Sequence, residues 1–183
     1  TFLVLAGWMS VFSRSNLKRG ALYAAVAGTI FLATTLVAVD APISFGIMFC
    51  MAASTLIHIP LERIGRGIPP WLGSTLCIVT FILTFDLPRS PHPLPGLAWL
   101  GLPDATFSSG DYYPLLPYSL LYFLGAELGR WHALRHAGEE EEFPRWAYVD
   151  HVPALSWMGR HALPIYLAHQ PIVLGLIILL LGG

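Results

Sequence analysis

The sequence has 183 residues, of which 55% are hydrophobic and only 11% are charged. Soluble domains usually have about a quarter of their residues charged, so this composition argues against an ordinary soluble domain and favours an integral membrane protein. The ten Lys and Arg residues nearly balance the eleven Asp and Glu residues, so the net charge selects no class of partner. Cys50 and Cys77 lie in apolar runs without the spacing of a metal site, which indicates small buried side chains.

Six apolar segments come close to the roughly 20 residues that a helix needs to cross the hydrocarbon core of a bilayer. In chain order they are residues 2–12, 21–39, 43–61, 68–85, 113–129 and 161–181. The first is short and begins at once after Thr1, so we interpret it as the end of a helix that starts upstream. Pro42, Pro69 and Pro70 are typical of first helical turns and predict where the third and fourth segments begin.

The second and sixth segments are apolar on every side, whereas helices of a soluble bundle should show a polar face. We therefore expect an all-α fold, a polytopic transmembrane helical bundle with about six membrane segments and a truncated first one. Residues 1–183 would form a single membrane-embedded domain, the C-terminal part of a longer chain.

Basic residues gather on alternate loops of this predicted topology. Nine of the ten lie between segments one and two, three and four, or five and six: Arg14, Lys18, Arg19, Arg63, Arg66, Arg130, Arg135, Arg145 and Arg160. The positive-inside rule makes these loops cytoplasmic, including the long loop 130–158. The loop 86–112, which holds Arg89, is then extracytoplasmic, and the C-terminus lies outside a cell membrane.

His169 interrupts the apolar pattern of the sixth segment. It lies nine residues beyond Arg160, about 13 Å along a helix and therefore near the middle of the bilayer. Gln170 and Pro171 follow it, and the proline leaves the carbonyl of Leu167 without its helical donor. These features predict a polar cavity at a functional ionisable residue. A histidine that only bonds to a neighbouring helix remains an equal alternative.

Three other positions have a structural and a functional interpretation. Arg160 and His161 are either topology anchors or anion ligands at the start of the sixth segment. Glu127 can form an ion pair with Arg130, three residues further along a helix, between glycines that allow close helix packing. Asp111 could cap the fifth segment or face an external substrate.

Four stretches resemble one family of membrane proteins. They are WMGRHALPIYLAHQPIVLGLIILL at 157–180, DYYPLLPYSLLYFLGAELGR at 111–130, FLVLAGWMSVFSR at 2–14 and ISFGIMF at 43–49. Taken in chain order, they resemble the heparan-α-glucosaminide N-acetyltransferase-like membrane proteins and their bacterial relatives, in which the stretches follow one another in the same order. The resemblance implies a multi-helix membrane acyltransferase that takes an acetyl group from cytosolic acetyl-CoA and delivers it to an amino sugar on the far side. The sequence has no zinc motif, so no metal is expected.

The sequence departs from that family in two places. Relatives begin with a helix that carries an LRG-type stretch and continue to a histidine thought to be catalytic, a region that would precede Thr1. Some relatives have a histidine after the FGI stretch, where this chain has Phe49. The chain as given is therefore expected to be an incomplete enzyme.

The leading hypothesis assigns the following roles. The phosphates of acyl-CoA bind Arg160, His161, Arg14, Lys18 and Arg19. The predicted catalytic residues are His169, as the general base, and Asp111, beside which a glycan or other small acceptor approaches. One alternative is a transporter or proton-coupled carrier that uses the midplane histidine as a relay. Another is an inactive fragment or a structural membrane subunit. The lipid bilayer is a partner in each case, and a homo-oligomer stays open, whereas nothing indicates nucleic acid.

Overall fold

The computed structural model describes residues 2–36, 43–137, 152–161, 164–165 and 168. Within these residues there is no strand, only an isolated bridge between Phe45 and Tyr112. The α-helices are α1 (Phe2–Val11), α2 (Asn16–Leu36), α3 (Ile47–Ile64), α4 (Pro70–Thr84), α5 (Leu115–Arg135) and α6 (Pro153–Arg160), with short 3-10 helices η1 (Gly65–Gly67), η2 (Leu87–Arg89) and η3 (Ala98–Leu100). The all-α fold is therefore confirmed.

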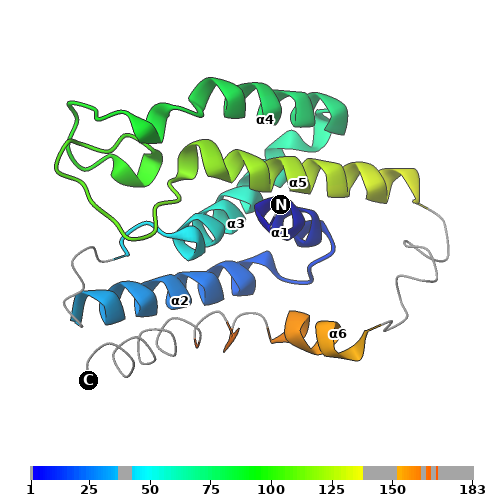
Figure 1. The fold of residues 1–183 in the computed structure, drawn as a ribbon. Helices are drawn as coiled ribbons and strands as arrows, with labels where there is room; N and C mark the ends of the chain where they lie inside the picture. Colours follow the sequence, from blue (N-terminus) through cyan, green and yellow to red (C-terminus); the bar gives the residue numbers. More distant parts are fainter. Residues whose placement is uncertain (1, 37–42, 138–151, 162–163, 166–167, 169–183) are drawn as a thin grey trace. The chain divides into compact units, whose positions relative to one another are not determined.

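The chain divides into two compact units, Thr1–Ala137 and Gly138–Gly183. In the first unit α5 is the central helix, because it packs against α1, α4 and α3, while α2 packs mainly against α3. Figure 1 shows α5 running between α4 on one side and α1 and α3 on the other. The second unit contributes α6, whose Trp157 ring stacks on His161 at 4.6 Å between ring centroids.

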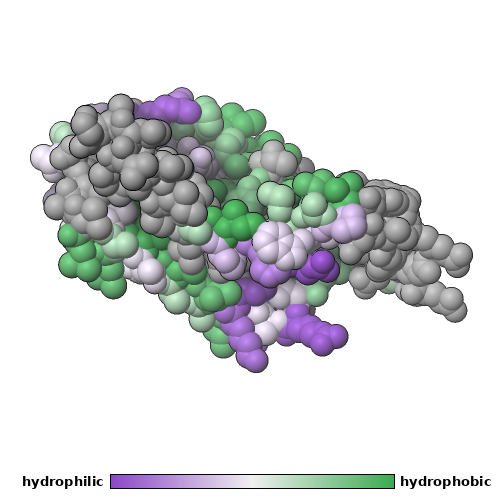
Figure 2. All heavy atoms as spheres, turned by 60° about the horizontal axis from the view of Figure 1, so that its bottom comes forward, coloured by the Kyte–Doolittle hydropathy of each residue, from purple (hydrophilic) through white to green (hydrophobic). Residues whose placement is uncertain are grey.

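Three of the described helices are long and apolar enough to cross a membrane: Asn16–Leu36, Ile47–Gly67 and Pro70–Arg89. Their outer faces expose large apolar side chains to the surroundings, as Leu83 on α4 does with 78% of its surface. Figure 2 shows broad hydrophobic areas among the residues that it colours, with the hydrophilic ones gathered in a few places. A surface of this kind suits a lipid environment and would be unfavourable in water.

Glycines bring the backbones of α1 and α5 into direct contact. A Cβ atom on Gly7 of α1 would lie 1.8 Å from the carbonyl oxygen of Tyr122, and one on Gly125 of α5 would lie 1.9 Å from that of Val4. Gly129, one turn further, faces the carbonyl of Trp8 in the same way. The close approach that the glycines at 125 and 129 predict is confirmed, and α1 is the helix that fills it.

Two helices differ from the expected segments. Helix α3 begins at Ile47, later than predicted, because Gly46 is extended (φ −77°, ψ −177°) and Tyr113 donates its amide to the carbonyl of Phe45 at 2.8 Å. Helix α5 continues to Arg135, through residues expected in a loop, and its first turn is irregular at Leu116 (φ −99°, ψ 128°). Helix α6 was not expected at all, and most of the sixth segment lies outside the described residues.

Candidate functional site

A cavity of about 480 Å³ lies between α3, α4 and α5. Its walls are mostly apolar, with a small group of polar and ionisable side chains: His58, Glu62, Cys77, Thr80, Glu127 and Arg130. Apolar cavities with a few convergent polar groups are the usual form of small-molecule sites. Because these groups sit on or beside helices of membrane-spanning length, the cavity is the leading candidate site among the described residues.

His58 lies on the face of α3 that packs against α5, and only 7% of it is exposed. Its ring stacks on Phe123 at 6.4 Å between centroids and meets the edge of Tyr122 at 6.1 Å. Within the described residues, the Nε2 atom of His58 is buried without a hydrogen-bond partner. A buried polar atom without a partner costs stability, so a ligand that bonds to it would gain from this arrangement.

Arg130 connects the helices and the turn at one end of the cavity. Its guanidinium donates hydrogen bonds to the carbonyls of Gly65 (3.1 Å) and Ile68 and lies 3.2 Å from a carboxylate oxygen of Glu127. The predicted Glu127–Arg130 pair is thus confirmed, and it also ties α5 to the turn between α3 and α4. Gly73 leaves room for this carboxylate, since a Cβ there would lie 2.7 Å from its Cδ atom.

Asp111 lies at a different structural junction. Its Oδ2 atom accepts a hydrogen bond from the amide of Ile47 at 3.1 Å, so it caps the first turn of α3 and not α5. Gly46 allows this approach, because a Cβ there would lie 2.6 Å from the carboxylate. The Ser109 hydroxyl donates to the carbonyl of Asp111 at 2.8 Å and fixes the loop. The geometry accounts for Asp111 as a cap, and its catalytic role stays a prediction.

Replacing Asp111 with alanine should lower the free energy of unfolding by about 1 kcal/mol, the usual cost of losing a helix cap. The Asp111→Asn variant should keep most of the stability, because the amide oxygen can accept the same bond. Asp104→Ala is the matched control, since that carboxylate bonds to Thr106 within its own loop. Thermal unfolding in detergent measures the effect. Unchanged stability together with lost acetyl transfer would instead identify a chemical role.

The loop before α5 forms a second, more polar hollow of about 450 Å³, lined by Arg89, Asp104, Ser108, Ser109, Tyr112 and their neighbours. The hydroxyl of Tyr112 donates to the carbonyl of Ala98 at 2.7 Å. Burial, with a smaller effect from Tyr118, raises the pKa of Tyr112 to about 12, so this donor stays protonated. Hydrogen bonds from Thr106 lower the pKa of Asp104 and keep its carboxylate charged. The hollow therefore offers a protonated tyrosine hydroxyl and a charged carboxylate as hydrogen-bonding groups.

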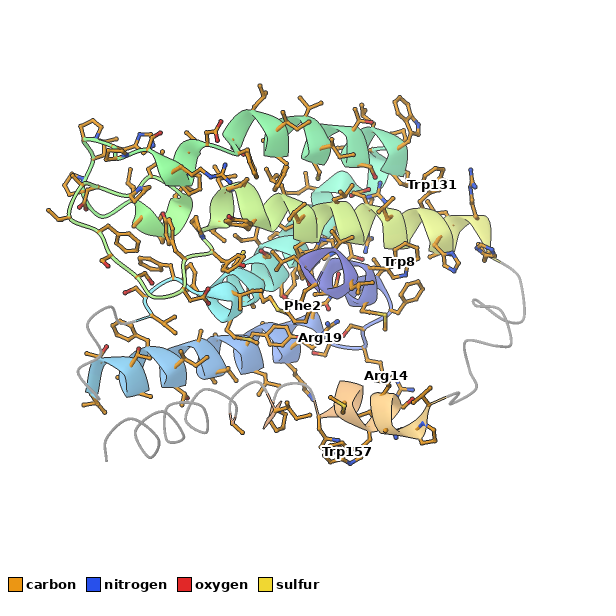
Figure 3. The ribbon with its side chains drawn as sticks, viewed as in Figure 1. Phe2, Trp8, Arg14, Arg19, Trp131 and Trp157 are labelled. Carbon is orange, nitrogen blue, oxygen red and sulfur yellow. The ribbon has the colours of Figure 1, made fainter. Side chains whose placement is uncertain are left out.

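The predicted anion ligands differ in their availability. Arg14 is exposed where the chain turns from α1 into α2 (Figure 3), and Lys18 is exposed in the first turn of α2. The described residues show no bond to either charged group. Arg19 is partly engaged, because it donates to the carbonyl of Met9 at 3.1 Å and to Tyr23 at 3.4 Å.

In the second unit, Arg160 lies in the last turn of α6 and His161 is its C-cap. The carbonyl of His161 also accepts a hydrogen bond from the amide of Ile165 at 3.0 Å, and the expected place of both residues at the start of the sixth segment stays a prediction. At a helix end a positive charge is favourable, which supports the interpretation as an anchor. Arg160 and His161 are both exposed. His169 lies outside the described residues, so its predicted position in a polar cavity stays a prediction.

Sequence reasoning did not single out His58. A weak signal was present, because a histidine within an apolar segment is unusual and Glu62 follows it by one helical turn. The pairing with α5 depends on contacts between residues more than 60 positions apart, such as His58 with Tyr122, which the sequence pattern alone does not reveal.

Comparison with known families now adds to this geometry. The model of the family described as "Heparan-alpha-glucosaminide N-acetyltransferase, catalytic" matches residues 1–171. The chain belongs to this family. The resemblance stated from the sequence is thereby confirmed, and the family together with the apolar helices points to a membrane acetyltransferase. No curated protein and no solved structure matches the chain.

Proposed function

We propose that this protein transfers an acetyl group from acetyl-CoA on the cytoplasmic side to a hydroxyl or amine of a glycan-type acceptor on the outer side. The family match over residues 1–171 carries the proposal, because it covers nearly the whole chain. The three helices of membrane-spanning length support an enzyme that works within a bilayer. The proposal includes a multi-pass topology with the basic loops in the cytoplasm and the C-terminus outside.

The donor's phosphates need cations that are not already neutralised. Arg130 is surrounded by carbonyls and Glu127, and Arg89 lies 2.9 Å from Asp86, so neither offers a free charge. Arg14 and Lys18 are exposed and suit the phosphates of CoA, while Arg19 can contribute with its remaining donors. Arg160 and His161, in the second unit, are proposed from the sequence as further phosphate ligands.

The acceptor is proposed to approach the loop 86–112. The polar hollow at this loop presents serine hydroxyls and the carboxylate of Asp104, which are typical partners for sugar hydroxyls. Asp111 lies near the C-terminal end of this loop and accepts the hydrogen bond from the Ile47 amide. It is proposed to orient the acceptor. His169 would then accept the proton that the attacking hydroxyl or amine loses.

Acetyl transfer by the full-length protein in lipid nanodiscs tests the proposal. Labelled acetyl-CoA is supplied with glucosamine-terminated oligosaccharides, and labelled product is measured by mass spectrometry. We expect transfer, with acetyl-CoA binding that weakens as salt increases, because exposed charge pairs are screened. Absence of CoA binding combined with substrate-dependent proton flux would contradict the transferase and support a carrier.

A further inference from the structure

We propose that the cavity between α3, α4 and α5 binds a membrane-dissolved amphiphile, an apolar chain that ends in an uncharged hydroxyl bonded to His58. This site is distinct from the exposed cations assigned to acetyl-CoA and from the hollow at the loop 86–112. Three features of the cavity lead to this ligand class: its exposed apolar rim, its charge balance and its one buried imidazole nitrogen without a partner among the described residues.

The rim of the cavity faces the region that lipid would occupy. Several of its apolar side chains are strongly exposed: Leu61 (43%), Ile64 (77%), Ile68 (45%), Leu72 (45%) and Leu76 (64%). Four of them lie within the spans Ile47–Gly67 and Pro70–Arg89, and Ile68 lies in the turn between these spans. A ligand can therefore enter sideways from the bilayer, and its chain gains by leaving the lipid only if its polar end finds a partner inside.

The charges inside the cavity disfavour an anionic ligand. Glu127 inside the cavity and Glu62, which is exposed at its edge, bring two carboxylates. Arg130 brings one guanidinium, which already bonds to two carbonyls and to Glu127. A phosphate or carboxylate group would meet an excess of negative charge in a medium of low dielectric constant. The ligand that fits is uncharged at the end that enters the cavity.

The Nε2 atom of His58 selects a hydroxyl. This atom is buried without a hydrogen-bond partner in the described part of the chain. The stacked ring of Phe123 and the edge-on ring of Tyr122 fix the direction of the imidazole. Depending on the tautomer, Nε2 donates or accepts a hydrogen bond. A hydroxyl can do both, so it satisfies His58 in either state, whereas a protonated amine could only donate.

Photoaffinity labelling tests this inference independently of acetyl transfer. The full-length protein in nanodiscs is irradiated with a diazirine analogue of farnesol, and labelled peptides are mapped by mass spectrometry. We expect labels on the peptides around His58 and Leu76 that excess farnesol removes. Farnesyl phosphate and the hydrocarbon farnesane should compete far less well, because one carries charge and the other lacks the hydroxyl.

Two pairs of variants make the test specific. His58→Leu should reduce labelling about fivefold, the effect of one buried hydrogen bond, while His92→Leu in the outer loop should not. Leu76→Trp fills the cavity and should also reduce labelling, while Leu83→Trp, two turns further along the same exposed face of α4, should not. Equal competition by farnesane or farnesyl phosphate, or full labelling of His58→Leu, would show ordinary lipid partitioning and overturn the proposal.

Discussion

Replacing His169 with alanine should lower the rate of acetyl transfer by about 10²- to 10⁴-fold, the usual contribution of a general base. A hydroxyl or amine acceptor must lose a proton as its oxygen or nitrogen attacks the thioester carbonyl. Histidine suits this step, because its unperturbed pKa lies near 6.5 and the neutral ring is abundant at pH 7. Initial rates with labelled acetyl-CoA, at saturating donor and acceptor, measure the effect.

The control for this prediction separates chemistry from folding. His92→Ala removes a histidine from the outer loop, where its ring nitrogen Nε2 lies 3.1 Å from the carbonyl of Leu87, and it should keep its rate. Acetyl-CoA should bind the His169→Ala protein as tightly as it binds the unaltered protein, since the phosphates are assigned to other residues. Unchanged turnover in His169→Ala would refute its catalytic role, while lost donor binding would indicate a structural one.

The sequence predicted the helices best where local signals agree. The pair of prolines at positions 69 and 70 marks the start of α4, and Pro70 is its first residue. Helix α1 was also placed within a residue of its observed end. The start of α3 was misplaced because the residues before Ile47 are held by the loop before α5, through the bond between Tyr113 and Phe45 and the cap from Asp111. Hydrogen bonds between residues so far apart produce no periodic pattern in the sequence from which they could be predicted.

The candidate site was predictable to a smaller extent. The ion pair of Glu127 with Arg130 follows from helical spacing and was expected. The hydrogen bonds from Arg130 to the turn after α3 were not expected. His58 became visible as a candidate only when α3 and α5 were seen to enclose a cavity. A contact between two residues of one helix can be predicted from their spacing in the sequence. A buried atom without a partner between two helices can be recognised only when the packing of these helices is known.

The packing of α1 against α5 leads to the largest expected effect on stability. Gly125→Ala should lower the free energy of unfolding by about 3 kcal/mol, at the upper end of the usual cost of overpacking. The added Cβ would lie 1.9 Å from the carbonyl oxygen of Val4, and backbone atoms cannot move aside as a flexible side chain can. Thermal or denaturant unfolding in a fixed detergent measures the change.

The matched control is Gly28→Ala on α2, where a Cβ would meet nothing within 4 Å and stability should be unchanged or slightly higher. Gly7→Ala should be as harmful as Gly125→Ala, because its Cβ would lie 1.8 Å from the carbonyl oxygen of Tyr122.

The double variant of Gly7 and Gly125 should lose less stability than the sum of the two single losses. Once one methyl group has separated α1 from α5, the second meets a gap that is already open. Additive losses would mean that the two glycines act independently, and an unchanged Gly125→Ala would contradict the close crossing itself. Glu127 and Arg130 lie on α5, so moving α5 away from α1 should also disturb the cavity. The glycines between α1 and α5 therefore affect the candidate site as well as stability.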